Sequence, residues 1–202
     1  MKVAILGGTG PFGRALAVRL ADAGDDVVIG SRDADRAAAA AGELGVRGTR
    51  NEAAVDGVDI VVLAVDASAA LATAQSLRFD APLISVASEL EFAAGAARPV
   101  AEATSLAERI AEAVEAPVAA GLHSLAARKL AHGRPDEDVF VCGDADDAKA
   151  LALELASRLV AGRTVDAGPL ASARALEAMT AVLVNVNRRY KAHAGLRVTG
   201  LP

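Results

Sequence analysis

Short apolar runs alternate with longer amphipathic or alanine-rich stretches through the first half of the chain. The apolar runs, which we predict to be β-strands, occupy residues 2–6, 25–30, 46–49, 59–65 and 82–86. The stretches that we predict to be helices occupy residues 14–23, 33–44, 51–56 and 67–77. This alternation builds βαβ units, and the run at 59–65 has no polar interruption, as expected of a central parallel strand.

The second half of the chain is less regular. Residues 87–100 show no constant spacing and are predicted to form a loop near the carboxyl ends of the strands. Further helices are predicted at residues 103–115, 145–160 and 171–194, and further strands at residues 117–121, 139–143 and 163–166. We also expect Ser124 to cap a short helix that ends at His132, because a serine hydroxyl accepts a hydrogen bond from the first helical N–H groups.

The last predicted helix carries an apolar stripe on one face. Its members, at spacings of three and four, are Leu176, Met179, Leu183, Val186 and Tyr190. We predict that this face lies in the core or in a dimer interface. Asn185 and Asn187 interrupt the stripe, and buried amides need hydrogen-bond partners. They indicate either an interhelical contact or a cofactor contact.

A chain of 202 residues can bury one good core with a small appended lobe, but not two full domains. The predicted fold class is therefore α/β, a Rossmann-like doubly wound, mostly parallel sheet with a small C-terminal helical lobe. We expect a dinucleotide-binding domain over residues 1–134. A smaller C-terminal region over residues 135–202 would contribute sheet-extending strands and the long helix.

Composition excludes several classes of function. The formal net charge of −5 argues against a nucleic-acid-binding surface, which needs an excess of Lys and Arg. Cys142 is the only cysteine, so we expect no disulfide framework, no metal site and a thiol that packs in the core. No apolar run reaches the length of a membrane span, and a strand that begins at Lys2 leaves no room for a signal peptide. We expect a cytoplasmic protein.

A glycine motif lies between the first strand and the first helix. Gly8, Gly10 and Gly13 form G-x-G-x-x-G, which in a strand–turn–helix context is typical of dinucleotide binding. Gly8 is expected to permit the tight turn, Gly10 to let the backbone approach a pyrophosphate, and Gly13 to let the helix pack closely. The pyrophosphate would lie on the free N–H groups at the helix N-terminus.

The end of the second strand indicates which dinucleotide binds. An Asp or Glu at this position would hydrogen-bond a ribose 2′-OH, whereas this chain has Ser31 and Arg32, with Arg36 one helical turn later. A charge-assisted hydrogen bond to a 2′-phosphate is worth about 1.5–3 kcal/mol. The sequence therefore favours NADP over NAD. The alternative is that both arginines only solvate the start of a helix.

Six segments, spread nearly from end to end, carry a resemblance to a known enzyme family. They are MKVAILGGTG (1–10), IGSR (29–32), GLHS (121–124), VCGD (141–144), DAGPL (166–170) and NRRYKAHAGLR (187–197). With these segments the chain resembles the F420H2:NADP+ oxidoreductases, also called NADPH-dependent F420 reductases. The resemblance implies hydride exchange between NADP and coenzyme F420, a C-terminal region on the deazaflavin side of the cleft, and a homodimer.

The resemblance also implies where each cofactor binds. By match to the family's motifs, NADP contacts fall on Thr9, Gly10, Pro11, Phe12, Ser31, Arg32 and Arg36. The nicotinamide would meet Ala67, Leu71 and Ala127, and the deazaflavin would meet the backbone near Ala194 and polar groups around His123. The chain departs from the family's usual residues at Asp66, at residues 85–89 and at Ala126, on the side of the second substrate.

Hydride transfer between two such rings needs no protein nucleophile and no metal ion. The protein must hold the reactive carbons roughly 3–3.5 Å apart with their faces aligned. We therefore assign His123 a positioning role and no residue a catalytic one, and expect its substitution to slow turnover moderately. The alternative is that His123 only satisfies local backbone groups. We expect His132 and His193 to lie at the surface.

Two other functions are compatible with the motifs. An imine or keto-acid reductase of similar fold would need a proton donor near the nicotinamide, for which His123 and Ser124 are the candidates. A non-catalytic NADP-sensing protein would bind NADPH tightly without oxidising it. The specific C-terminal segments favour the F420-linked enzyme.

Overall fold

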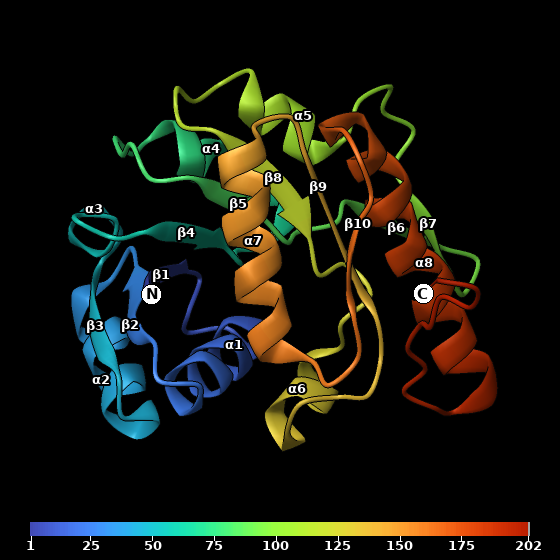
Figure 1. Cartoon of the computed structure of the whole chain (residues 1–202), viewed down its shortest axis with the longest axis horizontal. Coiled ribbons are helices and arrows are strands. Elements are labelled where there is room, and N and C mark those ends of the chain that lie inside the picture. The colour runs from blue at the N-terminus through green and yellow to red at the C-terminus, as the bar shows by residue number, and fades with distance from the viewer. Residues whose placement is uncertain (202) are drawn as a thin grey trace.

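The computed structural model describes residues 1–201, within which eight strands form one sheet covered by helices on both faces (Figure 1). The strand order is β10-β9-β8-β5-β4-β1-β2-β3. The strands are β1 Lys2–Leu6, β2 Asp26–Ser31, β3 Arg47–Arg50, β4 Ile60–Leu63, β5 Leu83–Ser85, β8 Val118–Gly121, β9 Val139–Gly143 and β10 Thr164–Asp166. Only the β8–β9 pair is antiparallel among these. The predicted α/β class with a mostly parallel sheet is confirmed.

The helices divide between the two faces of the sheet. They are α1 Pro11–Asp22, α2 Ala34–Leu44, α3 Asn51–Ala54, α4 Ala67–Gln75, α5 Leu106–Ala111, α6 Ala127–His132, α7 Asp146–Leu159 and α8 Ala173–Tyr190, with a 3-10 turn at Leu170–Ser172. One core layer joins β1 residues Val3 and Ile5 to α1, α2 and α7, and the other joins Ala4 and Leu6 to α4, α5 and the start of α8. Alternate side chains of a strand point to opposite faces, so the uninterrupted apolar strands bury both.

The topology indicates a candidate binding site at the carboxyl ends of the central strands. β1 pairs with β2 on one side and with β4 on the other, so the chain reverses its direction of winding beside β1. In open α/β sheets, ligands bind outside the carboxyl ends of the strands at such a point. The loops after β1, β2 and β4 therefore frame the candidate site.

Residues 87–100 were wrongly expected to form a loop without secondary structure. They hold an antiparallel hairpin of β6 Leu90–Ala93 and β7 Ala96–Pro99. Ala94 and Gly95 form its turn with positive φ angles of 48° and 79°, as a two-residue hairpin turn requires. The hairpin packs on α8, where the Asn185 amide bonds both the N–H and the carbonyl of Ala97 at 2.8 Å. Contacts with α8 stabilise this hairpin, so its own sequence does not need the alternation of apolar and polar residues that would predict a strand.

Ser124 does not cap the helix that follows it, which corrects a second expectation. A turn from Leu122, whose φ is 65°, to Leu125 separates Ser124 from α6, and Ala126 occupies the capping position without a side-chain hydrogen bond. The Ser124 hydroxyl is buried and makes no hydrogen bond within the described part of the chain. The predicted helix at residues 103–115 is also shorter, because Ser105 and Glu108 form a capping box that starts α5 at Leu106.

The C-terminal region continues the same sheet. β9 pairs with β8 across the predicted boundary at residue 134, and α7 packs on α1. The last helix is shorter than the predicted 171–194, since it ends at Tyr190 with Lys191 in the left-handed conformation. The division into regions 1–134 and 135–202 stays a prediction.

Candidate functional site

The glycine loop connects β1 to α1 with little room for side chains. The left-handed residue of the turn is Gly7, with a φ of 85°, whereas we expected Gly8 to permit the turn. A Cβ on Gly8 would instead lie 2.5 Å from Ile29 Cγ2 of β2, and a Cβ on Gly13 would overlap the Gly7 carbonyl oxygen. Gly8 therefore allows the loop to pack on β2, and Gly13 allows α1 to approach the loop.

The N-terminus of α1 can accept an anion. Gly10 is its capping residue and Pro11 its first helical residue, with no side-chain cap and no acidic residue in the first turn. The first N–H groups of a helix have no intrahelical partner and carry the positive end of the helix dipole. This end of α1 has the geometry that binds a pyrophosphate.

A first cavity of about 410 Å³ opens from the glycine loop toward the end of β2. Its lining includes five of the predicted NADP contacts, Thr9, Gly10, Ser31, Arg32 and Arg36. Thus residues from the loop, from β2 and from α2 meet around one space. The remaining lining includes Asn51 of α3, Asp66 after β4 and Thr73 of α4.

The two arginines of this cavity are available to an anion. Both Arg32 and Arg36 are exposed, and neither forms an ion pair within residues 1–201. The neighbouring Asp33 caps α2, where its carboxylate accepts hydrogen bonds from Asp35 N at 3.0 Å and from Arg36 N at 3.1 Å. That carboxylate therefore already has backbone partners.

Asn51 is a residue of this cavity that the sequence analysis missed. Its side chain is 5% exposed, and its amide oxygen has no hydrogen-bond partner among residues 1–201. A buried acceptor without a partner is costly unless a ligand supplies a donor. A dinucleotide with ribose hydroxyls and an adenine amino group would supply one. In the sequence, Asn51 is only a polar residue at the start of a short predicted helix, and nothing there indicates a ligand contact.

A second cavity of about 310 Å³ continues from the first. The two share Gly10, Ala64, Val65 and Asp66, so together they form one groove across the carboxyl ends of the strands. The second cavity is lined further by Pro11, Phe12, Ala67, Val86, Ala87, Ser88, Leu122, His123, Leu125 and Thr180. The predicted contacts Pro11, Phe12 and Ala67 therefore lie beside His123.

His123 is buried and uncharged in this cavity. Burial lowers its pKa to about 4, against a smaller opposing effect of the Ala87 backbone. Neither ring nitrogen makes a hydrogen bond of normal geometry within the described chain. A neutral imidazole offers one N–H donor and one nitrogen acceptor, and both ring nitrogens are buried here. The alternative that His123 only satisfies local backbone groups stays a prediction, because the backbone of Ala87 lies beside the ring.

Thr180 of α8 also lines the second cavity, although the sequence did not single it out. Its hydroxyl donates to the His123 carbonyl oxygen at 2.9 Å and lies 2.8 Å from the Ser88 hydroxyl. Because the single Thr180 proton is used on His123, Ser88 is the donor in the second contact. This polar position lies on the stripe of α8, beside Met179, and no local pattern distinguished it.

Three predicted contacts lie outside the groove. Leu71, Ala127 and Ala194 line neither of its cavities. Ala194 donates its N–H to the Asn187 side chain at 2.6 Å, in the segment that follows α8. The amides of Asn185 and Asn187 thus bond the hairpin and this segment, which corrects the expected interhelical contact, while the cofactor contact stays a prediction.

The remaining candidates are structural or exposed. Burial raises the pKa of Cys142 to about 12, so it remains a thiol packed between the sheet and the start of α8. His132 and His193 are exposed.

Within residues 1–201, no group of three or more His, Cys, Asp or Glu side chains is arranged to hold a metal ion. In the same part of the chain, every helix is too short or too polar for a membrane crossing.

Comparison with known proteins points to one group of enzymes. Residues 2–89 match the family model described as NADP oxidoreductase, coenzyme F420-dependent. The F420-dependent NADP reductase of Methanothermobacter marburgensis is 35% identical over the full length of both chains. A putative F420-dependent NADP reductase of Arthrobacter sp. FB24 superposes with a TM-score of 0.84 at 28% identity, covering 98% of this chain and 99% of that one.

A more distant likeness concerns the fold alone. An imine reductase from Aspergillus terreus superposes with a TM-score of 0.69 at 18% identity, covering 94% of this chain and 62% of that enzyme. The two proteins therefore share a fold.

Proposed function

The chain belongs to the family of F420-dependent NADP reductases, and we propose that it transfers a hydride directly between NADP(H) and the deazaflavin ring of coenzyme F420. The observation that carries this proposal is the continuous groove, which runs from two unpaired arginines to a buried neutral histidine. One half of the groove offers cationic groups for a phosphate, and the other offers a neutral, largely apolar space for a ring.

The first half of the groove fits NADP. The Arg32 and Arg36 guanidinium groups would hold the 2′-phosphate, the N-terminus of α1 the pyrophosphate, and the unpartnered Asn51 oxygen a hydroxyl or amino group. We expect these contacts to fix the dinucleotide along the ends of β1 and β4. Its nicotinamide would then lie in the second cavity.

The second half of the groove would orient the acceptor ring. NADPH supplies the hydride when it is bound. Phe12, Leu125 and Ala87 give this half apolar walls, which limit water around the reacting rings. His123 lines this half with a neutral imidazole, and the Thr180 hydroxyl hydrogen-bonds the backbone of His123. These groups position the rings and carry no charge themselves at neutral pH.

A keto- or imino-acid reductase is the rival function on the same groove. It would need an acid that protonates the product, and a histidine whose pKa is about 4 is a poor proton donor at neutral pH. The Ser124 hydroxyl, the other candidate, lines neither cavity of the groove. The geometry therefore favours the F420-linked reaction, and a cytoplasmic homodimer stays our expectation for its setting.

The decisive experiment is to mix the protein with NADPH and F420 and to follow the loss of F420 absorbance. The same assay with NADH, and with Arg32→Glu and Arg32→Lys, tests the assignment of the 2′-phosphate. We expect Arg32→Glu to raise the KM for NADPH about tenfold or more, since it removes a charged hydrogen bond, and to affect NADH less. Arg32→Lys, which keeps the charge, should lose less.

Two results would contradict the proposal. Turnover of keto or imino acids without any turnover of F420 would support the rival reductase. Tight NADPH binding with no acceptor at all would indicate an NADP sensor. Equal losses of NADPH and NADH in Arg32→Glu would show that Arg32 does not contact the 2′-phosphate.

A further inference from the structure

A third cavity lies beyond α6, outside the groove. It is open, measures about 420 Å³, and is lined by Arg128, Lys129, His132, Gly133, Arg134, Pro135 and His193. Apart from one glycine and one proline, each lining residue is a cationic or titratable nitrogen base. No carboxylate belongs to this lining among the described residues.

The surroundings of this cavity are basic in an acidic protein. Residues 126–137 and 186–201 together contain seven Lys and Arg but only two carboxylates, although the whole chain has a net charge of −5. Both carboxylates are paired, Glu137 with Lys129 and Asp136 with Arg197. Arg128 is exposed and forms no ion pair in residues 1–201, so its charge is available.

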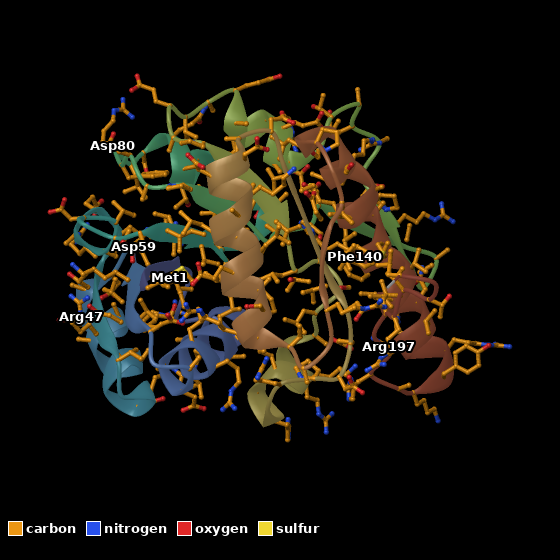
Figure 2. All side chains as sticks on the ribbon, viewed as in Figure 1. Met1, Arg47, Asp59, Asp80, Phe140 and Arg197 are labelled. Atoms are coloured by element: carbon orange, nitrogen blue, oxygen red, sulfur yellow. The ribbon has the colours of Figure 1, made fainter. Side chains whose placement is uncertain are left out.

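The segment after α8 is fastened beside α6. Asp138 donates its N–H to the Leu196 carbonyl oxygen at 2.8 Å, and the Asp138 carboxylate accepts the Val198 N–H at 2.8 Å. Gly195 lies against the Lys129–Glu137 pair, where a Cβ would come within 2.8 Å of Lys129 Nζ. Figure 2 shows Arg197 between α6 and the C-terminal end of α8. His193 therefore belongs to a fixed wall of the cavity.

The third cavity shares no lining residue with the groove but lies close to it along the chain. Leu125 lines the second cavity of the groove, and Arg128 lines the third cavity three residues later. Three residues of chain span at most roughly 10 Å. A ligand whose ring lies beside Leu125 would need only a short extension to bring an anionic group to Arg128.

We propose that the third cavity binds the anionic tail of F420, which carries a phosphate and γ-linked glutamates beyond the deazaflavin ring. This inference rests on the proposed function, since the ring must occupy the second cavity. Arg128 and Arg134 line the path of the tail, with His132 and His193 as hydrogen-bond partners. The Arg134 guanidinium is partly used on the Ser157 and Val160 carbonyl oxygens, which leaves Arg128 as the cation with the fewest other partners.

The test compares F420, with its phosphate and glutamates, to the tail-less deazaflavin that lacks both. We expect the wild-type KM to be at least tenfold lower for the tailed substrate at low ionic strength, and this advantage to shrink as salt is added. Arg128→Glu should raise the KM for tailed F420 about tenfold, with the kcat for that substrate and the KM for the tail-less one changed less than twofold. Arg128→Lys should recover most of the loss.

The matched control is Arg47→Glu, a charge reversal on exposed β3, which Figure 2 shows at the opposite end of the molecule from Arg197. It should leave both KM values unchanged. Equal wild-type KM values for the two substrates, independent of salt, would overturn the tail site even if Arg128→Glu fails to fold. Absence of turnover with both substrates would overturn the proposed function, and the tail site with it.

Discussion

At the residue scale, two glycines of one motif have different tasks. A Cβ on Gly13 would overlap the Gly7 carbonyl oxygen and lie 2.7 Å from Gly8 Cα, and backbone atoms cannot move aside cheaply. A Cβ on Gly10 would meet only the Gly7 carbonyl oxygen, at 3.4 Å, and Gly10 has an ordinary φ of −81°. Gly13 is thus required by the fold, whereas Gly10 is not, and we propose that its role is to let a ligand approach the backbone.

Gly13→Ala and Gly10→Ala separate these two requirements. We expect Gly13→Ala to lower the free energy of unfolding by roughly 1–3 kcal/mol, because overpacking outweighs the better helix propensity of alanine. Gly10→Ala should change stability by less than about 1 kcal/mol and weaken NADPH binding about tenfold or more. Urea unfolding and NADPH titration measure the two effects. Normal NADPH affinity in a folded Gly10→Ala would show that no pyrophosphate lies on this loop.

At the element scale, α8 links the groove to the rest of the molecule. Thr180 bonds the backbone of His123, Asn185 bonds the hairpin, and Glu177 bonds the start of α5. The buried Glu177 carboxylate accepts the N–H groups of Leu106 and Ala107, both at 3.1 Å. Burial raises the pKa of Glu177, although the two N–H donors oppose this effect. A carboxylate that is costly to bury is retained here because it caps a neighbouring helix.

Removal of the Glu177 carboxylate should loosen α8. We expect Glu177→Ala to cost about 2–3 kcal/mol of unfolding free energy, since two buried N–H groups lose their acceptor. Glu177→Gln keeps one acceptor oxygen and should cost less. Urea unfolding of both variants checks the order. A loss in Glu177→Gln equal to that in Glu177→Ala would contradict the capping role.

The same residue affects the pH dependence of stability. Because the folded-state pKa of Glu177 is raised, the native protein binds more protons than the unfolded chain at pH values above the ordinary glutamate pKa of 4.5. Its titration therefore makes the unfolding free energy fall as the pH rises from 4.5 through the folded-state pKa. In Glu177→Gln this part of the slope should be missing. An unchanged slope in that variant would show that other groups produce it.

At the scale of the whole molecule, the two halves of the chain share one sheet and one core. Leu16 and Leu20 of α1 belong to the same apolar cluster as Leu155 and Leu159 of α7. The Asp25 carboxylate, which is fully buried, accepts the N-terminal ammonium group at 2.7 Å and an Arg158 N–H at 2.6 Å. Loss of the C-terminal half would uncover this cluster and remove one partner of a buried charge.

A fragment of residues 1–134 should therefore not fold alone. Strand β8 would become an unprotected edge, and the α1 face would expose its apolar side chains to water. We expect weak circular dichroism or aggregation from the fragment, whereas the whole chain unfolds in one transition. A soluble fragment with a cooperative transition would instead establish residues 1–134 as an independent domain.

Local patterns predicted most of the sheet and half of the site. Strands such as β1 and β4 are apolar throughout, and the glycine loop with Ser31 and Arg32 is a continuous signal near the N-terminus. Asn51, Thr180 and the hairpin were missed because their roles depend on contacts with distant segments. The sequence around such a polar residue does not indicate which distant segment or ligand it will hydrogen-bond.

The sequence by itself predicted the alternating strands and helices of the first half, the glycine turn between the first strand and the first helix, and the preference for NADP. Each depends on neighbours within about thirty residues, where spacing along the chain fixes spacing in space. Only the tertiary structure decided that His123 is buried and neutral, that Thr180 lines the groove, and that α6 and the last segment line a basic cavity. The reason is physical: desolvation and the convergence of charges arise when segments far apart in the chain pack together, and no local pattern records them.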